Sequence, residues 1–158
     1  MQAAYLSAGM KIGITCPSGY VAHSRIEQAL HLLHAQGYET IVGKTIGLGA
    51  HYFAGTDEER LEDLQKALDD PSIKAIWAAR GGYGSVRIVD DLDFSKFMEQ
   101  PKWIIGYSDI TVLHNKLHEL GYQSVHGQMP LTLNLEDPVQ KESIQTLYKT
   151  LFGKKLQY

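Results

Sequence analysis

A serine at a sharp corner is the first feature of the sequence that could carry chemistry. The stretch GYSD at 106–109 follows a buried-strand pattern and precedes a helical pattern. Such a strand–turn–helix corner strains the backbone of its turn residue, and a glycine two residues earlier gives the backbone room, as in the nucleophile elbow G-x-S-x-G. Ile110 replaces the second glycine, so the motif is a half-match. Taken alone, the pattern favours Ser108 as a helix N-cap, with Asp109 stabilised by the helix dipole.

A glycine-rich loop is the second candidate. The stretch RGGYG at 80–84 also follows a buried-strand pattern. Adjacent glycines let backbone N–H groups face a ligand without intervening side chains, so the loop could bind a phosphate or supply oxyanion donors. It is not a phosphate-binding P-loop, because no G-K-[ST] follows. A tight turn would explain the glycines equally well, and Arg80 could pair with a substrate carboxylate or with a surface acid.

Histidine is the other residue type that could take part, and the chain has seven. His126 ends a strand pattern and could approach Ser108 as a general base, although a base also needs a partner that orients it. His114 follows Ser108 on the next helix and is expected to point away from the corner. Solvated helix positions are expected for most of the others: His31, His34 and His118. No histidine or cysteine spacing suggests zinc, and the pattern implies no metal and no cofactor.

Alternating strand and helix patterns would position these corners. Strand patterns cover residues 10–16, 38–43, 73–79, 102–106 and 122–127. Helical patterns cover residues 24–36, 57–70, 86–90, 94–98, 109–120 and 138–151, with Ser24 expected as the first N-cap and Thr56 with Glu59 as a capping box. The alternation predicts an α/β fold with a mainly parallel sheet, helices on both faces in flavodoxin-like layering, and the serine at a strand–helix turn. Ligands bind at the carboxyl ends of the strands in such sheets, where both corners would lie.

Length and composition limit the class of protein. The chain has 158 residues, which fits one domain. Its formal net charge of −3, with no basic block, argues against nucleic acid or an anionic membrane as the main partner. No apolar run approaches the ~20 residues of a membrane span, and the N-terminus lacks the pattern of a secretory signal. The single cysteine, Cys16, suits a reducing compartment, so a cytoplasmic protein is expected.

Four segments taken together resemble the LD-carboxypeptidase family of serine peptidases, which includes muramoyl-tetrapeptide carboxypeptidases and microcin self-immunity proteins. The segments are CPSG at 16–19, ARGGYG at 79–84, IIGYSDIT at 104–111 and HGQM at 126–129. The resemblance extends from about Lys11 to Tyr158. The pair RGGYG and GYSD[IL]T is specific at this separation, and Gln128 stands where the family pattern has proline.

This resemblance implies a role for each corner. Ser108 would attack an amide carbonyl, and the backbone N–H groups of Asp109 and Gly82 would form the oxyanion hole. The residues expected to bind the substrate are Arg80, Gly81, Tyr83, Ser18 and Gly19. The substrate would be a peptide with a C-terminal D-amino acid, such as the tetrapeptides of peptidoglycan recycling, or alternatively a microcin-like aminoacyl adenylate.

The resemblance also implies that a part of the machinery lies elsewhere. Members of the family are about twice this length, and their second domain supplies the histidine and glutamate of the triad. Residues 1–158 would then be a single N-terminal nucleophile domain with little or no turnover of its own, and the full-length protein would be a homodimer. Two alternatives stay open from the residues: a non-catalytic module that binds a small anion or a peptide carboxylate, and a complete hydrolase that uses His126.

Overall fold

The computed structural model describes residues 1–155, and a five-stranded parallel sheet forms the centre of this part of the chain. The strands are β1 (Lys11–Thr15), β2 (Glu39–Val42), β3 (Ile73–Ala78), β4 (Trp103–Gly106) and β5 (Val125–His126). They lie in the order β2-β1-β3-β4-β5, and each neighbouring pair is parallel. This is the order of flavodoxin-like sheets, so the predicted fold class is confirmed.

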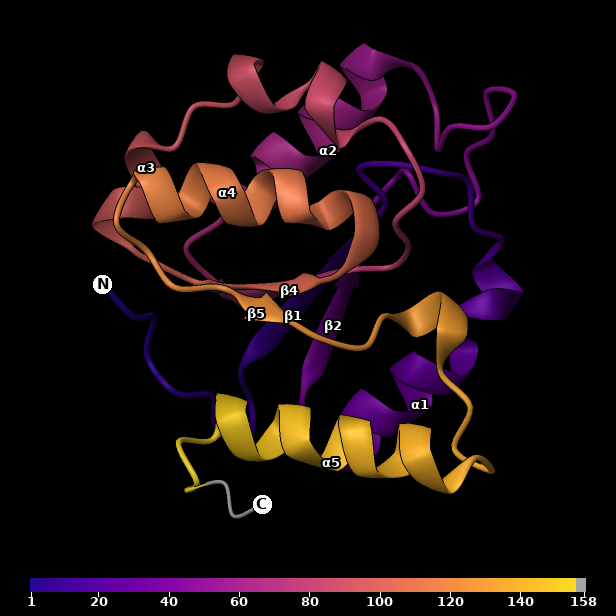
Figure 1. Ribbon diagram of the computed structural model, residues 1–158, viewed down its shortest axis with the longest axis vertical. Coiled ribbons are helices and arrows are strands. Elements are labelled where there is room, and N and C mark those ends of the chain that lie inside the picture. The colour runs from indigo at the N-terminus through magenta and orange to yellow at the C-terminus, as the bar shows by residue number, and fades with distance from the viewer. Residues whose placement is uncertain (156–158) are drawn as a thin grey trace.

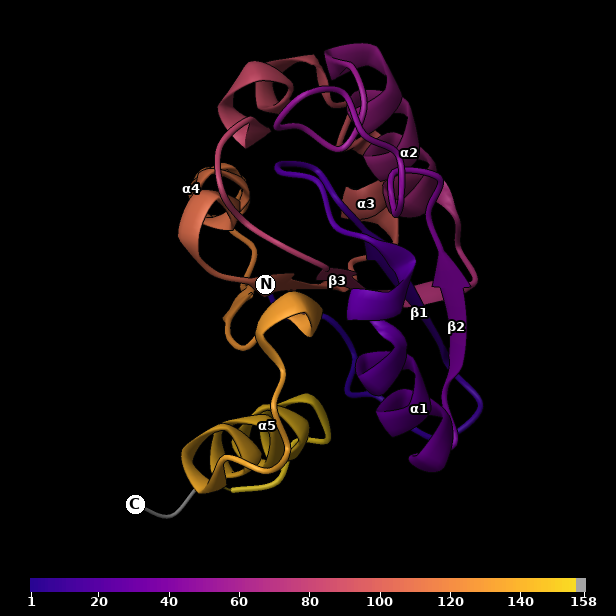
Figure 2. The ribbon, with the colours of Figure 1, turned by 90° about the vertical axis from the view of Figure 1, so that its right-hand side faces the viewer.

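Helices cover both faces of the sheet (Figures 1 and 2). One face carries α2 (Asp57–Asp69), α3 (Ser95–Glu99) and α4 (Thr111–Glu119), and the other carries α1 (Glu27–Ala35) and α5 (Pro138–Leu151). Right-handed crossovers between parallel strands produce this three-layer arrangement. None of the helices in the described part of the chain is both long enough and apolar enough to cross a membrane.

Alternation along the central strand divides the hydrophobic core in two. Ala75 and Trp77 of β3 pack with α1 and α5, whereas Ile76 and Ala78 pack with α2 and α4. Successive side chains of a strand point to opposite faces, so a strand covered on both sides must be apolar throughout. That requirement explains the uninterrupted apolar run AIWAA at 75–79, which follows the partly buried Lys74.

Most predicted elements are present, but some begin or end at other residues than the local sequence signals predict. Thr56 and Glu59 form the predicted capping box at the start of α2. The prediction that Ser24 caps the first helix is wrong: Ser24 lies inside a 3₁₀ turn (His23–Arg25), and Ile26 precedes α1 without a side-chain cap. The short helix predicted at 86–90 is a pair of 3₁₀ turns, Ser85–Arg87 and Val89–Asp91. β5 is shorter than predicted: two residues, Val125–His126, pair with β4.

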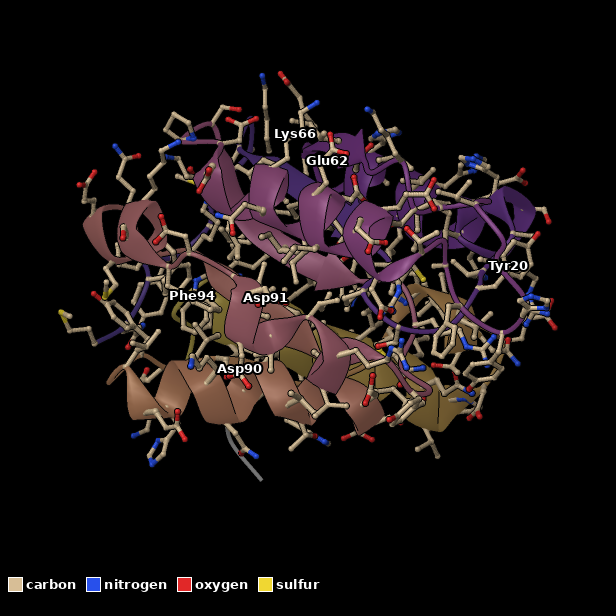
Figure 3. All side chains as sticks on the ribbon, turned by 90° about the horizontal axis from the view of Figure 1, so that it is seen from above. Tyr20, Glu62, Lys66, Asp90, Asp91 and Phe94 are labelled. Atoms are coloured by element: carbon tan, nitrogen blue, oxygen red, sulfur yellow. The ribbon has the colours of Figure 1, made fainter. Side chains whose placement is uncertain are left out.

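The strand order brings three loops together at one end of the sheet. β1 and β3 are neighbours and β4 lies beside β3, so the loops after these strands meet at the carboxyl edge, where open α/β sheets bind ligands. The CPSG loop follows β1, the RGGYG loop follows β3 and the GYSD corner follows β4. Figure 3 shows Tyr20, which follows the CPSG loop, at this end of the molecule, while Phe94 lies toward the opposite end.

A buried lysine binds backbone carbonyl groups at the C-terminal end of α2. Lys102, next to β4, is 2% exposed, and its Nζ donates to the carbonyl oxygens of Ala67 at 3.0 Å and Asp70 at 2.7 Å. Ala67 lies in the last turn of α2 and Asp70 is its C-cap, where backbone acceptors lack partners within the helix. Burial lowers the pKa of this ammonium group to about 8.

Lys102→Met should therefore remove a pH dependence of stability that the natural chain shows. The pKa is about 8 in the folded chain against an ordinary value of 10.5. Between these values the unfolded chain binds more protons, so the free energy of unfolding rises with pH. The rise due to Lys102 is at most about 1.4 kcal/mol per pH unit. Urea unfolding of both proteins from pH 8 to 10.5 measures the slopes, and equal slopes would contradict the burial of the amine.

Candidate active site

Ser108 occupies a strained corner between β4 and α4. Its φ angle is +61°, a left-handed conformation that non-glycine residues rarely adopt. Tyr107 before it is extended, and a 3₁₀ turn (Ser108–Ile110) leads directly into α4. A Cβ atom at Gly106 would lie 2.9 Å from the Ile110 side chain, so a glycine is needed for the helix to fold back at this point. The strained backbone that the motif predicted at Ser108 is confirmed.

The N-cap interpretation of Ser108 is wrong. Tyr107 precedes the 3₁₀ turn and Ile110 precedes α4, and neither position has a side-chain cap. Ser108 is exposed, and its hydroxyl makes no hydrogen bond to any of residues 1–155. The hydroxyl is therefore presented to solvent at the carboxyl edge of the sheet.

The glycine loop packs directly against this serine. A Cβ atom at Gly81 would lie 2.8 Å from the Ser108 Cβ and 3.0 Å from its Oγ. Only glycine permits this approach of backbone to side chain. Gly82 beside it is exposed and has a φ angle of +117°, which strains any residue with a side chain. The structure thus brings together the two corners that the sequence singled out.

The Asp109 carboxylate joins three loops. Its Oδ2 accepts a hydrogen bond from the Ser18 hydroxyl at 2.6 Å and another from the Ser85 N–H at 2.8 Å. The two serine hydroxyls are also 2.8 Å apart. Ser18 is fully buried, so its side chain ties the CPSG loop to Asp109 instead of facing a substrate, contrary to the expectation from the sequence.

The loops after β1 and β3 also interlock through their backbones. The Gly19 N–H donates to the carbonyl oxygen of Gly81 at 3.2 Å. Arg80 donates from Nη1 to the carbonyl oxygen of Tyr20 at 2.8 Å, and its guanidinium carbon lies 5.4 Å from the centre of the Tyr52 ring. Arg80 forms no ion pair within residues 1–155, so it has no surface acid as a partner there.

Tyr83 contributes an apolar rim to the corner. It is 53% exposed, and its ring centre lies 6.3 Å from that of Phe53. Tyr20 and Tyr52 are also partly exposed, at 38% and 49%. The corner therefore combines a free hydroxyl and a guanidinium with an aromatic surface.

Arg60 is a residue of this region that sequence reasoning missed. Its side chain is fully buried, and Nη1 donates to the carbonyl oxygens of Pro17 at 2.7 Å and Gly84 at 3.0 Å. Nη2 pairs with Asp57. The signal in the sequence is that Arg60 precedes Leu64 by one helical turn, which places it on the buried face of α2.

Two histidines lie near the corner without contacting the serine. His114 Nε2 is 3.0 Å from the carbonyl oxygen of Gly106, so the prediction that this side chain points away from the corner is wrong. Burial lowers the pKa of His114. His126 is exposed and its ring centre lies 6.1 Å from that of Tyr107, but no hydrogen bond joins it to Ser108. The predicted solvated positions are confirmed for His31, His34 and His118.

Cys16 is an unsuitable nucleophile despite its place in the CPSG loop. Its thiol is fully buried, lies 2.8 Å from the carbonyl oxygen of Gly19, and has a pKa raised to about 12 by burial. The thiolate is the reactive form, and it is nearly absent at neutral pH. In the part of the chain that the structure describes, no three His, Cys, Asp or Glu side chains gather so as to hold a metal ion.

A large hollow elsewhere does not compete with this site. It measures about 730 Å³ and lies beside β5, between the ends of α4 and α5, where His118, Ser124 and Thr150 are among its lining residues. It is open to solvent and contains neither Ser108 nor the glycine loop. Backbone strain at Ser108 and the close approach of the RGGYG loop favour the serine corner as the candidate site.

Several known proteins are similar to this chain in sequence. The chain is 36% identical over 148 residues to "Probable murein peptide carboxypeptidase" of Bacillus subtilis (strain 168), a match covering 91% of this chain and 46% of that protein. It is 35% identical over 126 residues to the murein tetrapeptide carboxypeptidase of Pseudomonas aeruginosa, covering 79% of this chain and 41% of that protein. The chain thus spans less than half the length of these relatives.

Solved structures show the same fold. The microcin C7 self-immunity protein MccF, in complex with aspartyl sulfamoyl adenosine, matches 100% of this chain and 48% of its own with a TM-score of 0.88 and 27% identity. Muramoyltetrapeptide carboxypeptidase from Oxalobacter formigenes matches 89% of this chain and 47% of its own with a TM-score of 0.77 and 31% identity. A family model described as the LD-carboxypeptidase N-terminal domain matches residues 12–127. This chain therefore belongs to the LD-carboxypeptidase family.

Proposed function

We propose that this chain is the nucleophile domain of a serine LD-carboxypeptidase, which hydrolyses the amide bond before a C-terminal D-amino acid. The observation that carries the proposal is the Ser108 corner: an exposed hydroxyl at a φ angle of +61°, against the backbone of Gly81. A strained turn that presents a serine beside a glycine-rich backbone suits acyl transfer. The names of the sequence relatives support murein peptides as the substrate.

In the proposed reaction, Ser108 Oγ attacks the carbonyl carbon of the last peptide bond. The backbone N–H groups of Asp109 and Gly82 stabilise the resulting oxyanion, and each such donor contributes about 2.7–4 kcal/mol to transition-state stabilisation. Collapse of the tetrahedral intermediate breaks the C–N bond and expels D-alanine, whose amine takes the proton that the base removed from Ser108, leaving the acyl-enzyme. Water then hydrolyses the acyl-enzyme.

The terminal carboxylate of the substrate requires a cation or N–H donors. Arg80 suits this role because it is half-buried beside the glycine loop and has no acidic partner within residues 1–155. A guanidinium can hold a carboxylate through two parallel hydrogen bonds. Gly19 and Gly81 lie beside this guanidinium, with the Gly19 N–H bonded to the Gly81 carbonyl oxygen, and the exposed Tyr83 ring would pack against the apolar part of the peptide.

The base of the triad is proposed to lie outside this chain. The relatives are more than twice as long as the segment matched here, and we assign the missing histidine and glutamate to that other half. A serine without its base retains only a small part of its catalytic power, so residues 1–158 by themselves should turn over little substrate. Action in the cytoplasm, in peptidoglycan recycling, and a homodimeric full-length protein are parts of the same proposal.

A second candidate function is hydrolysis of an aminoacyl adenylate, as in microcin self-immunity. It is supported by the structural match to MccF with a bound aspartyl sulfamoyl adenosine. A binding module without chemistry is the third candidate. Offering the complete gene product both a murein tetrapeptide and an aspartyl adenylate distinguishes the three. Release of D-alanine, release of AMP, or saturable binding without either product identifies one of them.

Ser108→Ala in the complete gene product should reduce release of D-alanine from a murein tetrapeptide on the order of 10⁴-fold or more, because the nucleophile is lost. Chromatographic measurement of free D-alanine gives the rate, and Ser143→Ala, which alters an exposed serine of α5, serves as the matched control. Retained activity in Ser108→Ala would remove this serine from the mechanism. Activity of the isolated chain that disappears in His126→Ala would instead favour a complete hydrolase.

The strain at Ser108 should be visible in stability. Ser108→Gly should unfold at a higher urea concentration than Ser108→Ala, because glycine adopts a positive φ angle without the penalty that alanine keeps. The left-handed conformation strains alanine, whereas glycine loses more chain entropy on folding. These two effects oppose each other, and the free energies of unfolding of the two variants should differ by about 0.5–1 kcal/mol. Equal midpoints for the two variants would contradict a strained serine.

A further inference from the structure

We propose that Arg60 and the Asp109 side chain are positioning residues that fix the peptide bond between Gly84 and Ser85, and with it the glycine loop beside Ser108. The catalytic consequence of this inference rests on the proposed function. The structural part does not, because it concerns how two charged groups hold a loop. Neither side chain needs to touch the substrate for this role.

The two charges hold the two ends of one peptide group. Arg60 Nη1 donates to the carbonyl oxygen of Gly84 at 3.0 Å, and the N–H of Ser85 donates to Asp109 Oδ2 at 2.8 Å. The carbonyl of Gly84 and the N–H of Ser85 belong to the same planar amide. A cation at the oxygen end and an anion at the hydrogen end both favour one orientation of its dipole, and both oppose its reversal.

The same two residues hold the loop after β1. Arg60 Nη1 also donates to the carbonyl oxygen of Pro17 at 2.7 Å, and Asp109 Oδ2 also accepts from the Ser18 hydroxyl at 2.6 Å. The CPSG loop and the end of the glycine loop are thus held side by side between one guanidinium and one carboxylate. Two consecutive residues of each loop take part, which fixes both the separation and the orientation of the loops.

Burial makes these contacts strong and specific. Arg60 is fully buried, and its guanidinium carbon lies 4.9 Å from the centre of the Phe53 ring. Hydrogen bonds are electrostatically stronger in such surroundings, and a buried charge without partners is costly. A Cβ atom at Gly84 would lie 2.6 Å from Arg60 Nη1, so glycine at this position lets the guanidinium reach the backbone.

Asp57 supports the arginine from the outer side. It pairs with Arg60 and accepts hydrogen bonds from Arg87 Nε at 3.0 and 2.8 Å. The hydrogen bonds from Arg87 hold the pKa of Asp57 below its usual range, so this carboxyl stays ionised. The Arg87 side chain is exposed and donates hydrogen bonds to Asp57 but none to Pro17 or Gly84, whereas the Arg87 backbone N–H donates to the Gly84 carbonyl oxygen at 3.0 Å, a contact that a side-chain substitution keeps. It therefore provides a control arginine that shares the same carboxylate.

The consequence for chemistry follows from the position of the held peptide. Gly82, whose N–H is the proposed oxyanion donor, lies two residues before Gly84, and both glycines have positive φ angles that leave the loop intrinsically adaptable. An oxyanion donor works only when it is already oriented toward the developing charge. Fixing the amide after Gly84 restricts the conformations available to the donor.

The structural part can be tested on the chain of 158 residues by amide hydrogen exchange in NMR. Arg60→Lys keeps the charge but lacks the forked guanidinium, and Asp109→Asn keeps the shape but removes the charge. In both variants the Ser85 amide should exchange about tenfold faster or more, because its hydrogen bond is weakened from one end or the other. Amides of β3 should be unaffected. Arg87→Met should leave the Ser85 amide as it is in the natural chain.

Unchanged exchange at Ser85 and Gly82 in both folded variants would overturn the inference. Faster exchange that extends equally over β3 would also overturn it, because it would indicate a general loss of stability instead of a released loop. If Arg60→Lys does not fold, Asp109→Asn alone decides, since it removes the opposite end of the same pair of contacts.

The catalytic part is tested in the complete gene product with a murein tetrapeptide. Arg60→Lys should lower kcat roughly 10–100-fold while KM changes little, as expected for a misplaced transition-state donor. Loss of activity in Ser108→Ala together with an unchanged kcat in Arg60→Lys would overturn the positioning role and leave the proposed function intact. Retained activity in Ser108→Ala would overturn the proposed function, while the exchange result at Ser85 would still stand.

Discussion

The close approach of a glycine backbone to Ser108 is the constraint on which the rest of this site depends. A side chain at Gly81 would collide with the Cβ and Oγ of that serine, so the two corners can meet only if the residue is glycine. The serine accepts a left-handed backbone at the same point. Strain of this kind persists only where surrounding structure determines it from several sides, and here the sheet, α4 and the glycine loop all contribute.

The sheet order decides which loops can surround the serine. β1 and β3 are neighbours although β2 and α2 separate them in the chain. Their following loops therefore lie together at the carboxyl edge, with the end of β4 beside them. This is the edge at which open α/β sheets bind ligands. Large hollows elsewhere, such as the one beside β5, lack this convergence of loops.

Two charged side chains hold the converging loops in place. Glycine-rich loops have no side-chain packing of their own to hold them, so their backbone groups need fixed partners. Arg60 and Asp109 provide these from opposite sides, one for carbonyl oxygens and one for donors. Asp109 directly follows the serine. In the proposed mechanism its N–H is one oxyanion donor, and its carboxylate anchors the glycine loop, whose Gly82 N–H is the other donor.

Local pattern was sufficient for much of the fold and for part of the site. Three features depend only on neighbours within a few residues, so short stretches of sequence predict them. They are the apolar run of β3, the capping box at Thr56 and the strained corner at Ser108. Ser24 and His114 differ from the sequence-based expectation because tertiary contacts decide their surroundings. His114 lies in the first turn of α4, and the packing of this helix on the sheet brings its Nε2 within 3.0 Å of the Gly106 carbonyl oxygen.

The sequence by itself determined the element order, the serine corner, the glycine loop and the family. Only the tertiary structure decided that Ser18 is an internal tie, that Arg60 is buried, and that Asp109 holds two loops at once. Ser18 and Asp109 are 91 residues apart, and no local pattern specifies which strands become neighbours. A polar side chain gains a defined partner only when strand pairing has removed water from its surroundings, which is why its role cannot be read from its type and spacing alone.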